Sequence, residues 1–187
     1  KTIGSKELFR LDRALVELLG IRGYGVHMIA YTRNKNFYKL WIPKRNKNKL
    51  IAPSKLDNTV AGGVKAGESI IESLRRESLE EASINHSHLK SVKLVGTINY
   101  SWKKSFSSIR RDTLFLFDLE VDSSFFPKCN DGEVENFKLM DWKKVLKLIQ
   151  STDSFKNNCA LVIANFLIRH GLLTNKNEKS YEEILRF

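Results

Sequence analysis

Hydrophobic and polar positions change their period several times along this chain, and each change marks the boundary of a predicted element. Near the N-terminus, leucines recur at helical spacing over residues 6–20, and Gly20 ends the predicted helix. Residues 24–32 then alternate and are rich in β-forming side chains, which predicts a strand. A second strand is predicted over residues 37–42. Because only the polar turn 33–36 separates the two strands, they are expected to form a hairpin.

The middle of the chain carries a segment in which three glycines precede a helical pattern. A short strand over residues 56–62 leads into this segment, and the helical pattern follows Gly67. Apolar or partly aliphatic side chains recur on one face of that helix, which is therefore expected to pack on a core. The residues on this face are Ile70, Ile71, Leu74 and Ser78.

Three further strands are predicted beyond the central helix. Residues 92–102 and 113–121 have the clearest strand patterns in the sequence. The polar, basic linker between them, residues 103–112, is expected to be a loop near the mouth of a site. A turn followed by alternating positions over residues 130–140 predicts another strand.

The C-terminal part of the chain is predicted to be helical. Asp141 is placed to cap a helix over residues 142–150, and residues 158–170 form a strongly apolar helical pattern that ends before Gly171. Residues 181–186 add a short amphipathic piece. Strands around one central helix, flanked by other helices, predict an α+β sandwich.

The length of 187 residues favours one domain with a substantial core. Residues 1–20 are interpreted as an N-terminal helix, or as the end of a longer N-terminal region, followed by a domain over residues 21–187. The first residue is lysine rather than methionine, which is compatible with a longer parent protein.

Composition narrows the class of protein. Two cysteines, Cys129 and Cys159, are too few for a disulfide framework, and no signal peptide or membrane-length apolar run is present, so a cytoplasmic location is expected. The net charge of +11 suits an anionic partner, but the basic residues are dispersed, without a zinc-finger spacing or a basic tail. A basic solvated surface and attraction of a small diphosphate both explain this charge, so charge alone does not decide the partner. A small-molecule diphosphate is expected as partner, and nucleic acid is not. The oligomeric state is left open.

Three carboxylates on the central helix carry the strongest chemical signal. Glu77, Glu80 and Glu81 are spaced so that they share one helix face, where like charges repel. A hard divalent cation such as Mg²⁺ would use such a cluster, because it prefers carboxylate and phosphate oxygens. The alternative is a merely solvated acidic face, in which Arg76 relieves the repulsion by pairing with Glu72 and Glu80.

The order of glycines, acids and arginine resembles the Nudix box, G-x5-E-x7-R-E-U-x-E-E-x-G-U, where U is aliphatic. The matching positions are Gly62, Glu68, Arg76, Glu77, Glu80, Glu81 and Ile84. Two positions depart, since Ser78 replaces an aliphatic residue and Ser83 replaces the second glycine. That glycine normally closes the helix with a positive φ, so Ser83 predicts either mild strain or a different turn.

The resemblance implies a Nudix fold, an α/β/α sandwich with a mixed sheet, and a Mg²⁺-dependent diphosphatase in which Mn²⁺ is a possible substitute. Glu77, Glu80 and Glu81 would be the metal ligands and catalytic carboxylates, with the carbonyl of Gly62 as a further ligand. Glu68 is assigned to structure, as the partner of Arg76 in an ion pair that holds the carboxylates in place.

Many Nudix enzymes add a carboxylate from a later loop or strand. Glu133 and Glu135 are the candidates here, and Glu133 is preferred because it lies nearer the turn. Both residues would face the same side of a strand, being two positions apart. A solvated acidic strand edge is the alternative.

Segments outside the box resemble the Nudix subfamily related to thiamine pyrophosphokinase. They are YGVHMIAYT, LWIPKR, LDNTVAGG, NDGEVENFKLM and NCALVIANFLIRHG. This resemblance implies hydrolysis of thiamine-type diphosphates, above all oxidised or damaged analogues such as oxo- and oxythiamine diphosphate, to the monophosphate and phosphate. In that subfamily EEAS is usual in place of EExG, which makes Ser83 less exceptional.

Such a ligand needs aromatic walls and polar anchors, and a few residues qualify. Candidates for the organic part are Trp41, Asp57, Asn58, Tyr100 and Trp102, and candidates for phosphate are Arg45, Lys55 and Arg111. His27, alone on its strand, is interpreted as a packed residue rather than a ligand. Two other functions stay open: a Nudix pyrophosphatase acting on another nucleoside diphosphate derivative or capped RNA, and a non-catalytic binding module.

Overall fold

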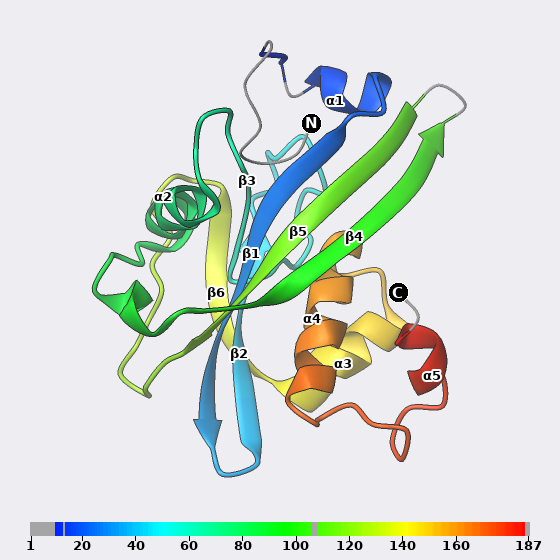
Figure 1. The fold of residues 1–187 in the computed structure, drawn as a ribbon. Coiled ribbons are helices and arrows are strands. Elements are labelled where there is room, and N and C mark those ends of the chain that lie inside the picture. The colour runs from blue at the N-terminus through cyan, green and yellow to red at the C-terminus, as the bar shows by residue number, and fades with distance from the viewer. Residues whose placement is uncertain (1–9, 13, 106–107, 186–187) are drawn as a thin grey trace.

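A mixed β-sheet organises the protein (Figure 1). The computed structural model describes residues 10–12, 14–105 and 108–185. The strands are β1 Arg22–Asn34, β2 Phe37–Arg45, β3 Val60–Gly63, β4 Lys93–Ser105, β5 Ser108–Glu120 and β6 Val134–Asp141. The helices are α1 Ala14–Leu18, α2 Ile70–Ala82, α3 Trp142–Ser151, α4 Asn157–Arg169 and α5 Tyr181–Ile184, with a 3₁₀ turn at His88–Ser91. In the part of the chain that is described, no helix is long and apolar enough to span a membrane.

The sheet has the order β4-β5-β1-β2-β6, and β3 pairs separately with β1. β1 runs parallel to β5, and the other pairings are antiparallel, which makes the sheet mixed as predicted. β1 pairs with β3 through residues 25–28 and with β2 through residues 31–34. β2 then leaves β1 and continues beside β6. The sheet therefore divides along β1, and β3 and β6 lie on separate branches.

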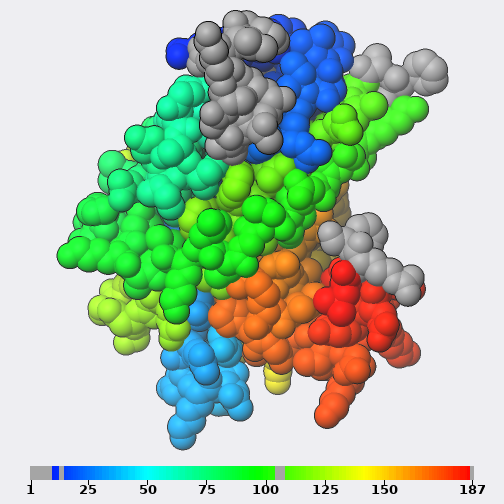
Figure 2. Space-filling model, in the orientation of Figure 1, coloured from blue at the N-terminus to red at the C-terminus, as the bar shows by residue number. Residues whose placement is uncertain are grey.

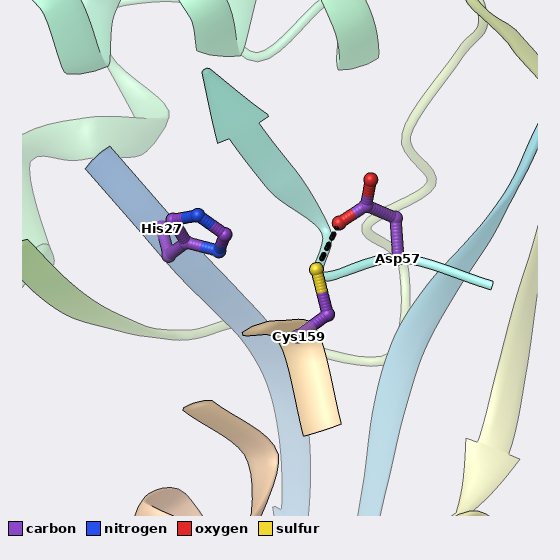
Figure 3. Close-up of side chains that lie close together, drawn as sticks. All are labelled: His27, Asp57 and Cys159. Carbon is purple, nitrogen blue, oxygen red and sulfur yellow. Dashed lines mark hydrogen bonds between the residues drawn. The ribbon is translucent and has the colours of Figure 1, made fainter. Parts of the chain in front are cut away.

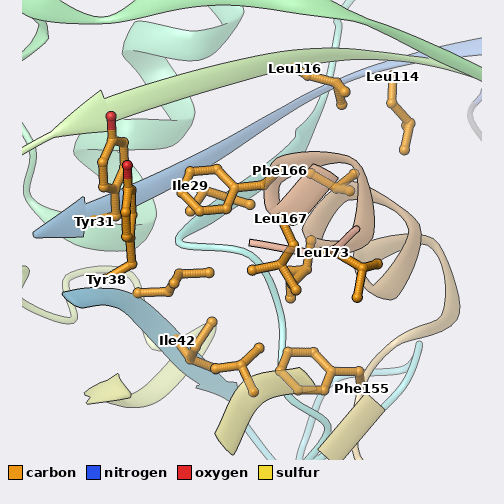
Figure 4. Packing of buried hydrophobic residues seen from close by; sticks show 14 residues of the cluster. Ile29, Tyr31, Tyr38, Ile42, Leu114, Leu116, Phe155, Phe166, Leu167 and Leu173 are labelled. Atoms are coloured by element: carbon orange, nitrogen blue, oxygen red, sulfur yellow. The ribbon is translucent and has the colours of Figure 1, made fainter. Parts of the chain in front are cut away.

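Strand alternation sorts the core into two layers. Val26, Met28 and Ala30 of β1 pack on the side of α2, where Leu74 is fully buried. Ile29 and Tyr31, on the opposite face, pack on Phe166 of α4 and its neighbours (Figure 4). Because successive strand side chains point to opposite faces, β1 serves both layers. The α+β sandwich, with α2 on one face of the sheet and α3 and α4 on the other, is confirmed (Figure 1).

The first predicted hairpin is confirmed, with Lys35 and Asn36 as its two-residue turn and Lys35 at φ 52°. The strand predicted over residues 56–62 is wrong in extent, because only Val60–Gly63 is a strand. Residues before Val60 are occupied instead by side-chain and backbone contacts to β2 and α4.

The predicted loop at residues 103–112 is also wrong. Its described residues extend β4 and β5 into a long antiparallel hairpin, which forms a diagonal band across the visible face of Figure 2. This end of the hairpin contacts α1, where Arg110 Nη1 pairs with Glu17 Oε1 at 2.8 Å. The reason is cross-strand pairing: Trp102 lies opposite Arg110 and Lys103 opposite Ile109, so these residues remain in the ladder although they resemble a loop in composition.

The helix predicted over residues 6–20 falls partly outside the described residues, which exclude 1–9 and 13. Within them, the helix covers only Ala14–Leu18, and Gly20 follows with φ 59°.

Candidate functional site

α2 is held at both ends by its own sequence. Ser69 caps the N-terminus in a capping box with Glu72, so Glu72 does not pair with Arg76 as the alternative interpretation supposed. At the C-terminus, Ser83 has φ 54° and ψ 28°, and the N–H of Ile84 donates to Ser78 O at 2.9 Å. The left-handed turn normally made by glycine is therefore kept, and the serine adopts it.

The buried face of α2 differs from the prediction. Ile71 was expected on the core stripe but is 42% exposed, whereas Glu81 is only 7% exposed. Leu74 and Ser78 do face the core, as expected. The helix is rotated so that two of its carboxylates, those of Glu77 and Glu81, point toward the sheet rather than the solvent. This orientation is possible because both acids find partners in or against β3 and on α2 itself.

Gly62 and Glu77 are the tightest fit in the site. A Cβ atom at Gly62 would lie 1.9 Å from Cδ and 2.2 Å from Oε1 of Glu77. Gly62 has an ordinary strand conformation, so glycine is needed here for space and not for a positive φ. The missing side chain lets the Glu77 carboxylate lie directly against the backbone of β3.

Glu81 is anchored to the same strand. Its Oε2 accepts a hydrogen bond from the Ala61 N–H at 2.9 Å. Burial raises the pKa of the Glu81 carboxyl to about 8, the Ala61 N–H opposes this shift, and the charges of Asp57, Glu77 and Glu133 add to it. Burial likewise raises the pKa of Glu77 against the opposing effect of Arg76. Both carboxyl groups are therefore harder to ionise than an exposed glutamate.

Arg76 holds the acidic residues in register. Its guanidinium donates to Glu68 Oε1 at 2.8 Å and to Glu68 Oε2 at 3.0 Å, and it reaches Glu77 at 2.7 Å and Glu80 at 3.0 Å. The Nη2 of Arg76 also donates to Gly63 O at 3.0 Å, which ties the end of β3 to α2. Hydrogen bonding to Arg76 lowers the pKa of Glu68 to about 2. The predicted Glu68–Arg76 ion pair is confirmed.

These residues suit a divalent cation. Glu77 and Glu81 are crowded and largely buried, and burial raises the pKa of each although Glu77 pairs with Arg76. Glu80 stands one position before Glu81 with 45% of its side chain exposed. A cation at these carboxylates would remove the cost that raises their pKa values. The space left by the missing side chain of Gly62 is filled by the Glu77 carboxylate, so the role of the Gly62 carbonyl as a metal ligand stays a prediction.

The structure separates Glu133 from Glu135. Glu133 precedes β6, pairs with Lys49, and contributes to the raised pKa of both Glu77 and Glu81. Glu135 lies on β6 and pairs with Lys44 at 3.0 Å. Glu133 is therefore the residue of the two that lies within electrostatic reach of the α2 carboxylates.

A second polar cluster lies on the α4 side of the sheet. His27 of β1, Asp57 before β3 and Cys159 of α4 point toward one another, and one ligand-type atom of each lies within 4.8 Å of the others (Figure 3). The Cys159 thiol donates to Asp57 Oδ1 at 2.6 Å, and burial raises its pKa. His27 Nδ1 lies 2.7 Å from Asn58 Oδ1, and burial lowers the pKa of His27 to about 4. All three groups are committed to hydrogen bonds or ion pairs, so the cluster is a polar core.

Several predicted substrate residues belong to this polar core or its edge. Arg45 donates to Ile51 O, Ala52 O and Asp57 Oδ2, which leaves its guanidinium engaged within the protein rather than directed to a phosphate. Asn58 is 1% exposed. Lys55 pairs with Asp153 at 2.6 Å.

The predicted aromatic and basic residues divide between the two faces of the sheet. Tyr100 and Trp102 lie on the α4 face of β4, where Trp102 is 50% exposed and Tyr100 donates to Asp112 Oδ2 at 2.5 Å. Trp41 packs on the α2 face against Phe125 and Phe126. Arg111 has the same strand parity as the α2-face residues of β5. These four residues therefore do not line one common pocket.

Sequence reasoning missed Asp112 and Lys156. Asp112 is 6% exposed and binds Arg110 Nε at 2.6 Å as well as Tyr100. Lys156 is the residue before α4, with Nζ 3.7 Å from Asp57 Oδ2. The sequence pattern marks neither residue. Asp57, the partner of Lys156, is distant in sequence, and Tyr100 meets Asp112 only through the pairing of β4 with β5.

A helix that presses carboxylates against a glycine-bearing strand, within a mixed sheet covered on both faces by helices, places the protein in the class with the Nudix fold. The NUDIX domain model matches residues 22–159, and the chain belongs to this family.

Relatives and solved structures agree with this assignment. The chain is 42% identical over 165 residues to "Nudix hydrolase 20, chloroplastic" of Arabidopsis thaliana, covering 88% of this chain and 44% of that protein. It is 38% identical to "Nudix hydrolase 24, chloroplastic" of the same plant, covering 88% and 45%. The chain thus spans less than half the length of these two relatives. The crystal structure of DR0079 from Deinococcus radiodurans superposes with a TM-score of 0.61 at 22% identity, covering 84% of this chain and 89% of that one, which shows a shared fold.

Proposed function

We propose that this protein is a Mg²⁺-dependent diphosphatase that cleaves thiamine-type diphosphates, preferentially oxidised or damaged analogues, to the monophosphate and orthophosphate. The observation that carries the chemistry is the pair of inward carboxylates, Glu77 against Gly62 and Glu81 on the Ala61 N–H. Burial raises the pKa values of both carboxyl groups, and such perturbed groups concentrate at functional sites.

Each residue has a distinct task in this proposal. Glu77, Glu80 and Glu81 would hold the cation, which would neutralise phosphate oxygens and lower the pKa of a bound water. Arg76 fixes the orientation of Glu77 and Glu80, and Glu68 fixes Arg76. Glu133 is proposed to orient or deprotonate the attacking water, because its charge acts on both buried carboxylates. Water adds to phosphorus as the bridging P–O bond breaks, and the leaving phosphate takes up the bond electrons and a proton.

The substrate class rests on different observations. Four of the segments that resemble the thiamine-related subfamily lie outside the box, in or around β1, β2, β6 and α4, and the fifth leads through β3 into it. On the α4 face, Trp102 and Tyr100 offer aromatic surface, while the buried Asp112 is already bound by Tyr100 and Arg110. Aromatic faces suit a heteroaromatic cation. These groups support the proposal without defining which analogue is preferred.

A side-by-side assay tests the proposal. Phosphate release would be measured with Mg²⁺ from thiamine diphosphate, oxothiamine diphosphate, ADP-ribose and capped RNA, with Glu80→Gln as the control variant. Faster turnover of the thiamine-type compounds, abolished in Glu80→Gln, supports both chemistry and substrate class. Turnover of only a nucleotide or of capped RNA contradicts the substrate class, and binding without turnover of any compound contradicts the enzyme.

A further inference from the structure

A groove opens at the end of the β1–β2 hairpin, on the α3 and α4 side of the sheet. Its volume is about 870 Å³, and its walls are the hairpin turn, α3 and the segment that follows α4. Figure 2 shows the notch between the light-blue hairpin and the orange segment after α4. The groove is separate from the carboxylate site. Gly62 pairs with Val26 on β1, and Arg33 in the groove lies seven positions further along that strand, about 23 Å at 3.3 Å per residue.

One wall of the groove is a packed stack of aromatic rings. Tyr38 is 5% exposed and stacks on Tyr31, with ring centroids 5.8 Å apart, and the His170 ring lies 5.4 Å from that of Tyr38. Asp118 fixes the His170 ring, because its Oδ2 lies 2.9 Å from His170 Nε2. Phe37 also lines the groove and is 72% exposed. The groove therefore combines a rigid aromatic wall with an aromatic ring that is open to a ligand.

Three cations line the groove: Arg33, Lys143 and Lys147. The Arg33 guanidinium lies over the Tyr38 ring at 5.5 Å, and the Lys143 ammonium lies over the Trp142 ring at 5.8 Å. Lys143 and Lys147 are four positions apart on α3, so their side chains lie on one face of that helix. Within the described part of the chain, none of the three forms an ion pair with a carboxylate. Their charges are therefore available to an anionic ligand.

The carboxylates near the groove are held by other groups. Asp141, the one acid among the described residues that line it, caps α3 by accepting from a backbone N–H. Glu178 Oε2 accepts from Gln150 Nε2 at 2.8 Å, and Asp118 forms two hydrogen bonds with Arg169, at 2.7 Å and 2.9 Å. Three cations against Asp141 leave two positive charges in excess, and counting Glu178 as well still leaves one.

The shape of the groove favours a small molecule over a peptide. Only Phe37 and Tyr38 of β2 lie beyond its pairing with β6, which is too short an edge for an extended peptide to add a strand. Along α3, Lys143 and Lys147 flank Leu146, so the continuous apolar stripe that an amphipathic helix would need is interrupted. The volume is that of a small-molecule site. Ammonium and guanidinium donors bind phosphate, and exposed aromatic rings stack on nucleobases.

We propose that this groove binds a nucleoside monophosphate, with the base against Phe37 and Trp142 and the phosphate on Arg33, Lys143 and Lys147. A monophosphate has no phosphoric anhydride bond, so it is a ligand of this site and not a substrate of the proposed diphosphatase. The inference does not rest on the proposed function, because the groove lies in the layer of α3 and α4 and the carboxylates lie in the layer of α2.

Nitrogen-15 NMR of the tryptophan indole groups tests the proposal at one side chain. The chain has three tryptophans, and Trp142→Phe identifies the Trp142 signal. AMP, adenosine and inorganic phosphate would be titrated into the full chain in EDTA. We expect AMP to move the Trp142 signal saturably, with a dissociation constant at least about tenfold below those of adenosine and of phosphate. The signals of Trp41 and Trp102, which lie outside the groove, should stay in place.

Variants test the two kinds of contact separately. Lys147→Glu and Lys144→Glu make the same change of charge at exposed positions of α3, but only Lys147 lines the groove. The dissociation constant of AMP should rise about tenfold in Lys147→Glu and by less than about twofold in Lys144→Glu. Phe37→Ala, at an exposed position, should weaken AMP binding at least about fivefold and leave phosphate binding unchanged.

A Trp142 signal that AMP does not move, equal affinity for AMP and phosphate, or equal losses in Lys147→Glu and Lys144→Glu would overturn the proposal. Tighter binding of an acidic, phenylalanine-containing pentapeptide than of AMP would do so as well, because it would assign the groove to a protein partner. The titrations contain neither divalent metal nor a phosphoric anhydride, so their outcome is independent of the turnover assay. AMP binding at Trp142 together with no turnover of any diphosphate would sink only the proposed function.

Discussion

The carboxylate of Glu77 occupies the space that a side chain at Gly62 would fill. The two residues are 15 positions apart on α2 and β3, and a Cβ at Gly62 would lie 1.9 Å from Glu77 Cδ. A single methyl group must therefore displace the carboxylate. A substitution at Gly62 therefore acts directly on the proposed metal site.

Gly62→Ala is expected to reduce turnover at least about a hundredfold, because a displacement of about 1 Å in a catalytic group is enough for a loss of that size. Phosphate release with saturating Mg²⁺ measures the loss. Gly67→Ala is not a neutral control, since Gly67 has φ 86°. The control is Ala61→Gly, which increases backbone freedom at the neighbouring position without a clash. This variant should lose far less activity. Normal turnover in Gly62→Ala would show that Glu77 does not need its present position.

Glu81→Gln is expected to stabilise the protein in the absence of metal while it removes the response to metal. Burial raises the pKa of Glu81 to about 8, so stability is lost as pH rises from the unfolded value near 4.5 toward 8. A neutral amide keeps an acceptor for the Ala61 N–H and avoids that cost. The melting temperature without Mg²⁺ should rise by about 5 °C.

Scanning calorimetry with and without Mg²⁺ checks both parts of this prediction. Wild-type protein should melt at a higher temperature when Mg²⁺ is added, because the cation binds only the folded state, and EDTA should reverse the shift. Glu81→Gln should show little of this shift. An undiminished Mg²⁺ shift in the variant would remove Glu81 from the ligand set.

Arg76→Met is expected to reduce both turnover and stability. The guanidinium joins Glu68, Glu77, Glu80 and the Gly63 carbonyl, so its loss leaves partly buried acids without their cation. We expect unfolding to become easier by about 2–4 kcal/mol, measured by urea titration at neutral pH. Arg75→Met on the exposed face of the same helix is the matched control and should change stability little. Similar losses in the two variants would contradict this account of Arg76.

The buried His27 predicts a stability change at mildly acidic pH. Burial lowers its pKa from 6.5 to about 4, so the folded state holds it neutral while the unfolded chain takes up a proton. The contribution of His27 is therefore fully present above pH 6.5 and is lost as the pH falls toward 4, by about 1 kcal/mol per pH unit.

Urea unfolding at pH 7.5 and pH 5.5 measures this effect. The loss of stability between the two pH values should be smaller in His27→Gln than in the wild type by about 1 kcal/mol. The control is His86→Gln, because His86 is exposed in the segment between α2 and the 3₁₀ turn. This variant should keep the wild-type pH dependence. The same slope in His27→Gln as in the wild type would show that His27 does not titrate in this way.

The sequence predicted the local features of α2 but not the orientation of this helix against the sheet. The spacing of Glu77, Glu80 and Glu81, the Glu68–Arg76 pair and the stop at Ser83 are all local, because helical geometry brings together residues a few positions apart. The rotation of α2 was not predictable in this way. Ile71 suggested one buried face, and the free volume at Gly62 together with the Ala61 N–H selected another.

The chain by itself determined where most strands lie and the order of the glycines and acids, and therefore the family and its fold, since these depend on alternation and on fixed short spacing. It did not determine the extent of β3 or the length of the β4–β5 hairpin. Tertiary structure alone decided which side chains share a face and which charges stay unmatched. Tyr100 meets Asp112 through strand register, and Asp57 meets Arg45, Cys159 and Lys156 through the packing of α4 on the divided sheet. Partners so far apart in sequence leave no periodic signal. Their charge balance exists only after the chain has removed them from water.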